Sequence, residues 1–338
     1  LDVTGNNIAN VATTGFKSSR AEFADIYAAS KLGTGQNSIG NGVNLAAVSQ
    51  QFTQGDVNGS GGILDMAIQG GGFFVQKGSD GSLEYTRSGA FRADKDGYIT
   101  NNTGTSRLQG YAADADGKII KGGLVDLQLN LSNLPPKAST KVDSTSNLNS
   151  SEPVIDQTAK PFNPNDTSTF TTQYSTTLYD SQGNAHPMVQ YLVKTDGNKW
   201  SAYTLIDGRN PDGSAPTGTP STPPVPSALT FDGNGKLTSV VTGGVSNKTL
   251  TITGWVPGTV TDGVWKANGA NANPTGIAVN MANITQYNSA TYRNPPVTDG
   301  YATGQITGLK IDGSGVLFAT FSNQQSKAIG QISLASFN

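Results

Sequence analysis

Apolar and polar residues alternate along the middle of the chain with the two-residue period of β-strands. The alternation runs from Phe170 to Leu178 and returns from Val189 to Val193, with turn residues at 181–184 between them. After Asp196-Gly197, a third apolar series occupies residues 200–205. Alternation interrupted by such turns predicts an antiparallel meander.

Asp-Gly pairs divide the preceding part of the chain. Apolar residues cluster over 63–75, and the segment after them is punctuated by Asp80-Gly81, Asp96-Gly97 and Asp116-Gly117. Such a pair predicts a hairpin, because glycine accepts the positive φ that the turn requires. Pro135-Pro136 ends the series, since proline cannot donate to a sheet ladder.

The pattern after residue 137 predicts a second β-rich block and then further hairpins. A proline-rich surface loop is expected over residues 210–228, inside the block 137–285. Near the end of the chain, residues 304–311 are expected to pair with 316–321, and a last strand is expected over 329–334.

The first thirty residues carry a weaker, helix-like pattern. Leu1, Ile8 and Val11 have heptad-like spacing, and Phe23 begins a second short series with Ile26 and Tyr27. Thr13-Thr14-Gly15 interrupts the pattern, and so short a helix is marginal alone in water. Residues 31–62, rich in Gly, Asn, Ser and Gln, have the composition of an extended linker.

Composition narrows the class of protein. The 338 residues suggest two compact units, and only 35% are hydrophobic and 14% charged. A net charge of −2 argues against a nucleic-acid partner, and no apolar run is long enough to insert into a membrane. The chain has no cysteine, which excludes disulfides and thiolate metal sites. These features predict a mainly β protein with small cores.

Catalytic chemistry is hard to assemble from these residues. The single histidine, His186, follows a turn and is interpreted as a polar surface residue rather than a catalyst. Most aspartates lie in turn motifs where they cap the backbone. The run from Asp114 resembles the start of a calcium loop, but Val125 stands where the bidentate glutamate should be. We expect no enzyme activity, no catalytic or metal-binding residues, and no cofactor.

The N-terminal motif resembles the signature of bacterial flagellar rod and hook proteins. The run Leu1-Asp2-Val3-Thr4-Gly5-Asn6-Asn7-Ile8-Ala9-Asn10 is followed by Thr13-Thr14-Gly15-Phe16-Lys17. Further blocks resemble the same superfamily: residues 65–74, 85–91 and 108–111. The residues that carry the predicted assembly motif are Gly5, Asn6, Asn7, Ile8, Ala9, Asn10, Thr14, Gly15, Phe16 and Lys17.

Within that superfamily, hook proteins fit best. The segments 179–186 and 321–335 resemble hook-protein sequence, and the similarity is dense over 1–111 and 301–338 but sparse from about 205 to 285. The resemblance implies a structural subunit that forms a helical homopolymer, a flexible curved tube that acts as a universal joint between rod and filament. The implied partners are copies of itself, the rod, the hook cap, the hook–filament junction proteins and the flagellar type III export apparatus.

The resemblance also implies a domain organisation and a location. Residues 1–50 would form an N-terminal helix and extended linker of the tube core, residues 51–136 plus 287–338 a discontinuous β domain, and residues 137–286 an inserted outer β domain. The family's C-terminal partner helix is missing here, so we expect the chain by itself to be a soluble monomer. The implied location is the extracellular hook, reached without a cleaved signal peptide.

Two alternatives stay open. The distal rod protein belongs to the same superfamily but is shorter where this chain carries 137–285. A secreted carbohydrate-binding or adhesive β module would need exposed aromatic residues on one face, whereas Trp200, Trp255 and Trp265 are expected in the core.

Overall fold

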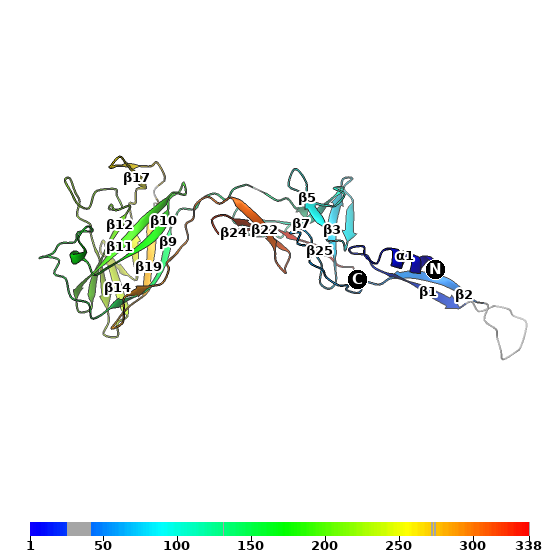
Figure 1. The fold of residues 1–338 in the computed structure, drawn as a ribbon, viewed down its shortest axis with the longest axis horizontal. Coiled ribbons are helices and arrows are strands. Elements are labelled where there is room, and N and C mark those ends of the chain that lie inside the picture. Colours follow the sequence, from blue (N-terminus) through cyan, green and yellow to red (C-terminus); the bar gives the residue numbers. More distant parts are fainter. Residues whose placement is uncertain (26–41, 131, 272, 274, 338) are drawn as a thin grey trace, which may run out of the picture. The chain divides into compact units, whose positions relative to one another are not determined.

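The computed structural model describes residues 1–25, 42–130, 132–271, 273 and 275–337. Contacts divide the chain into two compact units (Figure 1). Unit 1 comprises Leu1–Ser132 and Ile306–Asn338, and unit 2 comprises Asn133–Gln305. Unit 2 is therefore inserted into unit 1, and nearly all regular elements of both units are strands. The predicted mainly β class is confirmed.

Unit 1 contains one helix, a two-stranded ribbon and a ten-stranded sheet among its described residues. The elements are α1 (Asp2–Ala9), β1 (Ser19–Asp25), β2 (Val43–Gln50), β3 (Phe73–Gly78), β4 (Leu83–Thr86), β5 (Phe91–Ala93), β6 (Ile99–Asn101), β7 (Ser106–Ala112), β8 (Val125–Asp126), β22 (Ile306–Ile311), β23 (Val316–Phe321), β24 (Ser326–Ile332) and β25 (Leu334–Ala335). The central path of the sheet is β22-β23-β24-β7-β3-β25, so β24 and β25 from the end of the chain lie on either side of β7 and β3.

The core of unit 1 lies between these intermixed strands. Ile99 and Leu108 are fully buried, and they cluster with Phe74, Leu317 and Ile332. Because Leu317 and Ile332 come from the last fifty residues, neither half of unit 1 can complete this core alone. The expected pairing of 304–311 with 316–321 is confirmed as β22 and β23.

The N-terminal region differs from its predicted pattern after residue 15. The helix near Ile8 is confirmed as α1, but Phe23 belongs to β1 and not to a second helical series. Part of the expected linker is also a strand, because β2 pairs antiparallel with β1. In this two-stranded ladder, alternate residues of each strand exchange backbone hydrogen bonds with the other strand. These bonds hold the two segments together, whereas so short a helix without a partner is marginal in water. Ile26, Tyr27 and residues 31–41 of the expected linker lie outside the described residues.

Unit 2 contains a six-stranded sheet, a five-stranded sheet and a separate hairpin among its described residues. Its elements are β9 (Lys141–Asn149), the 3₁₀ turn η1 (Thr167–Thr169), β10 (Thr172–Tyr179), β11 (Ala185–Asp196), β12 (Lys199–Ile206), β13 (Ser227–Phe231), β14 (Leu237–Thr242), β15 (Val245–Asn247), β16 (Thr249–Ile252), β17 (Gly258–Thr261), β18 (Val264–Ala267), β19 (Ile277–Tyr287), β20 (Tyr292–Arg293) and β21 (Val297–Thr298). The predicted meander is confirmed as β10 to β12, and the sheet continues through β13, β14 and β15 in chain order.

The two larger sheets of unit 2 share one apolar core. The five-stranded sheet contains a parallel pair, β9 with β19, flanked by β16 on one side and by β20 and β21 on the other. Trp200 of the six-stranded sheet is 1% exposed, and its Nε1 donates to Gln286 Oε1 of β19 at 2.6 Å. A buried indole N–H needs such a partner, so this bond fixes how the sheets face each other.

The other two tryptophans divide between the core and the surface. Trp255 is buried in the unit 2 core, as expected, whereas Trp265 is half-buried on the β17–β18 hairpin. The Trp265 ring packs against the backbone of Gly213 and Gly258, and the Arg209 guanidinium lies 5.9 Å from its centroid. Trp265 therefore attaches the hairpin to the neighbouring loop and is not a core residue.

One turn design recurs in both units. In each copy an aspartate Oδ1 accepts the backbone N–H groups two and four residues later, and a glycine three residues later has positive φ. The copies begin at Asp94, Asp114, Asp180, Asp232 and Asp312. The carboxylate satisfies backbone donors that the turn would otherwise leave open, so these aspartates have a structural role.

The turn from Asp232 offers a matched test of this design. Gly235 has φ of +73°, and an added Cβ would lie 2.4 Å from Gln286 O, whereas nothing lies within 4 Å of a Cβ added to Gly233. We expect Gly235→Ala to lower the free energy of unfolding by about 1–3 kcal/mol and Gly233→Ala to change it little. Urea unfolding followed by tryptophan fluorescence measures both. Equal effects of the two substitutions would contradict the assigned geometry.

Candidate assembly segment

The first half of the predicted motif forms an exposed helix. None of the residues of α1 is buried, and Ile8 and the following Val11 are 69% and 84% exposed. Gly5, Asn6 and Ala9 are also exposed. The rest of unit 1 does not bury these apolar side chains, so they point outward into the solvent.

Asparagine side chains determine where α1 ends and where β1 begins. Asn7 Nδ2 donates to Ser19 O at 2.8 Å, and Ser19 N donates to Asn7 Oδ1 at 2.9 Å. Asn10 Nδ2 donates to both Asn6 O and Asn6 Oδ1 at 3.0 Å, and Thr13 Oγ1 donates to Asn10 Oδ1. An asparagine can donate and accept at once. Asn7 therefore fastens the helix to the first residue of the ribbon.

The second half of the motif attaches the segment to the body of unit 1. Gly15 has φ of +76°, and a Cβ added there would lie 2.5 Å from Ser88 N. Phe16 is half-buried, and Lys17 Nζ donates to Thr53 O at 2.7 Å. Thr14 is exposed. The structure thus brings Gly15 against Ser88, which lies in one of the further sequence blocks of the resemblance, residues 85–91.

Substitution of Gly15 and of Gly5 by alanine should have opposite effects on the stability of the N-terminal segment. Gly15→Ala should destabilise the junction with Ser88 by about 1–3 kcal/mol, because it adds both backbone strain and a steric clash. Gly5→Ala meets nothing within 4 Å and should stabilise α1 by about 0.5–1 kcal/mol. Hydrogen exchange of residues 1–25 reports both changes. Faster exchange in Gly5→Ala, or unchanged exchange in Gly15→Ala, would contradict the described contacts.

The ribbon of β1 and β2 has an apolar face that the sequence pattern did not reveal. Phe23 is directly opposite Leu45, and Ala21 is opposite Val48. Phe23 and Leu45 remain 64% and 56% exposed, and Val43 and Val48 are exposed too. Opposed residues of an antiparallel pair share one face. A register shift leaves Ala46 of β2 without a partner and interrupts the alternation there, although the apolar residues of 43–48 could have indicated a strand.

An aromatic cluster joins distant parts of unit 1. The Phe73 ring contacts Phe52 and Phe337 edge-on, with centroids 5.7 and 5.6 Å apart. Tyr85 contacts Phe337 at 4.8 Å between centroids, and the Arg87 guanidinium lies 5.0 Å from the Phe73 centroid. These contacts pack residues 52 and 337 against β3 and β4. No local sequence signal marks the cluster, because its members are distant in the chain.

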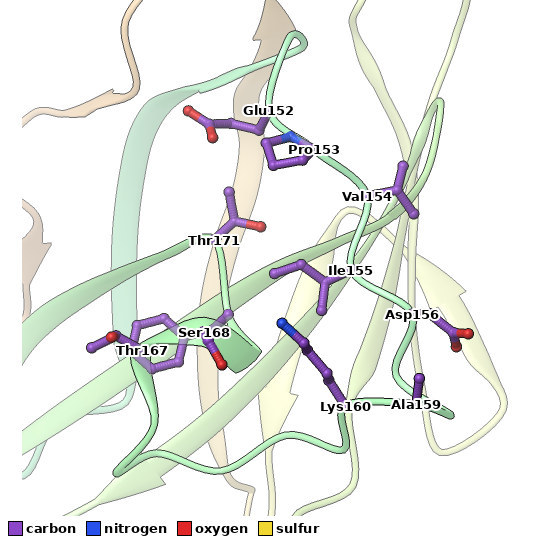
Figure 2. A pocket seen from close by; sticks show the side chains of 11 residues that line it. Glu152, Pro153, Val154, Ile155, Asp156, Ala159, Lys160, Thr167, Ser168 and Thr171 are labelled. Carbon is purple, nitrogen blue, oxygen red and sulfur yellow. The ribbon is translucent and has the colours of Figure 1, made fainter.

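A cleft in unit 2 offers little catalytic chemistry. The cleft has a volume of about 430 Å³. Figure 2 shows that the Lys160 side chain extends toward Ile155 and Ser168. Glu152 and Asp156 are its carboxylates, and it contains no histidine or cysteine to activate a nucleophile. Elsewhere in the described residues, no group of three or more His, Asp or Glu side chains could hold a metal ion.

The interpretation of His186 as a surface residue is wrong. His186 is 2% exposed and lies on β11, where both ring nitrogens contact aspartates. The polar neighbours Asp180 and Asn184 made the sequence around it look like an exposed turn. In the structure Asp180 is buried and, together with Asp207, supplies the hydrogen bonds that allow a polar ring to be buried.

Comparison with known proteins identifies the family. The chain is 37% identical over 341 residues to the flagellar hook protein FlgE of Salmonella typhimurium, covering 100% of this chain and 75% of that protein. It is 36% identical to FlgE of Escherichia coli, with the same coverage. The chain belongs to the flagellar hook protein family. It is therefore similar throughout its length to structural proteins of the hook.

Domain matches and a solved structure agree with this assignment. Residues 67–135 match the flagellar hook protein FlgE/F/G D1 domain, and residues 147–301 match the flagellar basal body protein FlaE D2 domain. The crystal structure of Helicobacter pylori flagellar hook protein FlgE2 has a similar fold, with a TM-score of 0.53 at 13% identity, covering 82% of this chain and 89% of that one. In the described part of this hook protein, no helix is long and apolar enough to cross a membrane.

Proposed function

We propose that this hook protein polymerises helically into a flexible curved tube, a universal joint that transmits torque from rod to filament. The observation that carries the proposal is the apolar surface of α1 and of the β1–β2 ribbon, which lies in the segment with the family motif. Ile8, Val11, Phe23 and Leu45 are all more than half exposed. Exposed apolar patches of this kind mark interaction sites, and a helical polymer supplies a neighbouring copy of the chain at every subunit.

The motif residues have two proposed roles in assembly. Asn7, Asn10 and Gly15 hold the segment in shape, through the contacts with Ser19, Asn6 and Ser88. Ile8 and its neighbours Ala9 and Asn6 face solvent and are available to other subunits. Positioning by polar side chains leaves the apolar ones free for contacts between copies.

The two compact units support a three-part organisation. We propose that residues 1–50 belong to the tube core, that 51–136 plus 287–338 form the inner β domain, and that 137–286 form the outer domain. The insertion of unit 2 into unit 1 supports the discontinuous inner domain. One observation does not support the border at residue 287, because β20 and β21, within residues 292–298, pair with β9 inside unit 2.

Partners and location follow from the family as proposals. The chain would bind copies of itself, the rod, the hook cap and the hook–filament junction proteins, and would be exported by the flagellar type III apparatus without a cleaved signal peptide. Its place would be the extracellular hook, and it would have no enzyme activity. The low charged fraction of 14% suits this role. Copies of the chain must slide past one another when the tube bends, and uncharged polar surfaces hinder such sliding less than fixed ion pairs do.

Electron microscopy of the full-length gene product, expressed in cells that lack their own copy, tests the proposal. We expect short curved tubes between rod and filament. Straight rods would favour the distal rod protein instead. Normal motility without any assembly of this protein would favour a binding module and would contradict the proposed function.

A pair of neighbouring substitutions tests the role of the ribbon. Leu45→Lys places a charge on the apolar face, whereas Asn44→Lys places it at the adjacent exposed position, which points to the other face. We expect the first to abolish or shorten hooks and the second to leave them unchanged. Neither should alter the free energy of unfolding by more than about 0.5 kcal/mol, as is usual for exposed positions.

The measurements are hook length in micrographs and urea unfolding of the purified chain. Normal hooks in cells with Leu45→Lys would contradict the assignment of this face to assembly. A loss of hooks with Asn44→Lys would show that charge anywhere on the ribbon is harmful, and would also contradict it.

A further inference from the structure

His186 is buried between two carboxylates in unit 2. Its Nδ1 lies 2.7 Å from Asp207 Oδ2, and its Nε2 lies 3.2 Å from Asp180 Oδ2. Asp180 is 0% exposed, and the His186 ring meets the edge of Trp255 with centroids 5.2 Å apart. The contacts of His186 lie inside unit 2, so they play no direct part in contacts between subunits.

The geometry determines the protonation state of this ring. An ionised carboxylate has no proton to donate, so each ring nitrogen that contacts one must itself carry a proton. Both nitrogens of His186 are in such contacts, so the ring takes the imidazolium form when both carboxylates are ionised. Asp180 is also held ionised, because the amide groups of Asn184 and Asn268 donate to its Oδ2 at 2.9 and 2.7 Å.

The cluster connects three separate segments of unit 2. Asp180 belongs to the turn between β10 and β11, and Asp207 follows β12 with a positive φ of 54°. Asn268 follows β18, and the same loop is held a second time where Asn271 N donates to Ser181 Oγ at 2.9 Å. The bond from Asn268 to Asp180 thus ties the end of the β17–β18 hairpin to the buried imidazolium.

We propose that His186 is a proton-dependent clasp: its protonated ring holds the turn after β12 on the β10–β11 turn, and loss of the proton at alkaline pH releases the turn after β12. Without the proton, one ring nitrogen would present a lone pair to a carboxylate. Asp180 and Asp207 would then share a single imidazole donor, and their repulsion would favour opening. Asp207 is the carboxylate that can move away, because its side chain is 21% exposed whereas that of Asp180 is 0% exposed.

The charged groups that contact the His186 ring are both aspartates. Asp180 contacts it from the turn and Asp207 from the end of β12, while Trp255 and Asn268 approach from later loops without charge. Burial alone would lower the pKa of His186, but the hydrogen bonds to Asp207 and Asp180 outweigh it and raise this pKa above 6.5. Burial likewise opposes ionisation of Asp180, yet the bonds from Asn184, Asn268 and His186 lower its pKa to about 2.

These directions give the pH window. A raised histidine pKa contributes stability that is complete below pH 6.5 and is lost as the pH rises through the folded value. A lowered aspartate pKa contributes stability that is complete above pH 3.8 and is lost as the pH falls through about 2. The clasp is therefore closed in weak acid and opens on the alkaline side.

Because the chain has one histidine, its imidazole can be titrated without ambiguity. Nitrogen NMR of the ¹⁵N-histidine-labelled chain should show both ring nitrogens protonated at pH 6.5, with a midpoint above that of a free histidine side chain. Asp207→Asn should lower the midpoint. Asp232→Asn is the control, since Asp232 occupies an equivalent turn without a histidine. A midpoint at or below 6.5, a single neutral tautomer at pH 6.5, or no effect of Asp207→Asn would overturn the proposal.

Hydrogen exchange tests the release itself. After correction for the intrinsic effect of pH, the amide of Arg209, which donates to Ile206 O at 2.9 Å in the turn of Asp207, should lose protection at alkaline pH, while amides within the β10–β11 ladder keep theirs. In His186→Gln the protection of this amide should no longer change with pH. Retained protection at alkaline pH in the unaltered chain, or a pH dependence that persists in His186→Gln, would contradict the clasp.

Discussion

The first fifty residues contain apolar side chains that the fold does not bury. A helix of eight residues and a ribbon of two strands are each marginal in water by themselves. In this structure they are held by asparagine hydrogen bonds and by the contact of Gly15 with Ser88, while Ile8, Phe23 and Leu45 remain exposed. The segment is shaped by polar contacts inside the chain, and its apolar surface needs contacts outside it. Membership of the hook family makes other copies of the chain the natural source of those contacts.

The remainder of the chain is organised as two bodies that are complete in themselves. Each has a small apolar core, and each closes its hairpins with aspartate carboxylates that satisfy backbone donors. In unit 2, Trp200 and Gln286 connect the two sheets through one buried hydrogen bond, and His186 connects three loops through another polar cluster. A chain with few large apolar residues can thus adopt one defined structure, because its buried polar groups have defined partners.

The sequence pattern predicted the elements that depend on local periodicity. It failed where the structure of a segment depends on residues that are distant in the chain. The alternation from Phe170 to Leu178 and the Asp-Gly turns predicted β10, β11 and their hairpins correctly, because strand period and turn chemistry are local. Phe23 was assigned to a helix because its spacing from Ile26 and Tyr27 fits a helical period, whereas its cross-strand partner Leu45 is distant in the chain. His186 was placed on the surface because polar residues surround it in the sequence. In the structure one of them, Asp180, is buried beside the ring. The parallel pair of β9 and β19 joins residues more than a hundred positions apart, and no local signal marks it.

The central claim is that the ribbon face becomes buried when the protein assembles. The absence of cysteine from the sequence allows a single thiol to be introduced as an accessibility probe. Leu45→Cys in the full-length protein should react rapidly with a maleimide as the monomer and should be protected in isolated hooks. Val225→Cys, at a position 85% exposed in a unit 2 loop, is the control and should react in both forms. If Leu45→Cys reacted as fast in hooks as in the monomer, this face would not be the assembly surface and the central claim would be wrong.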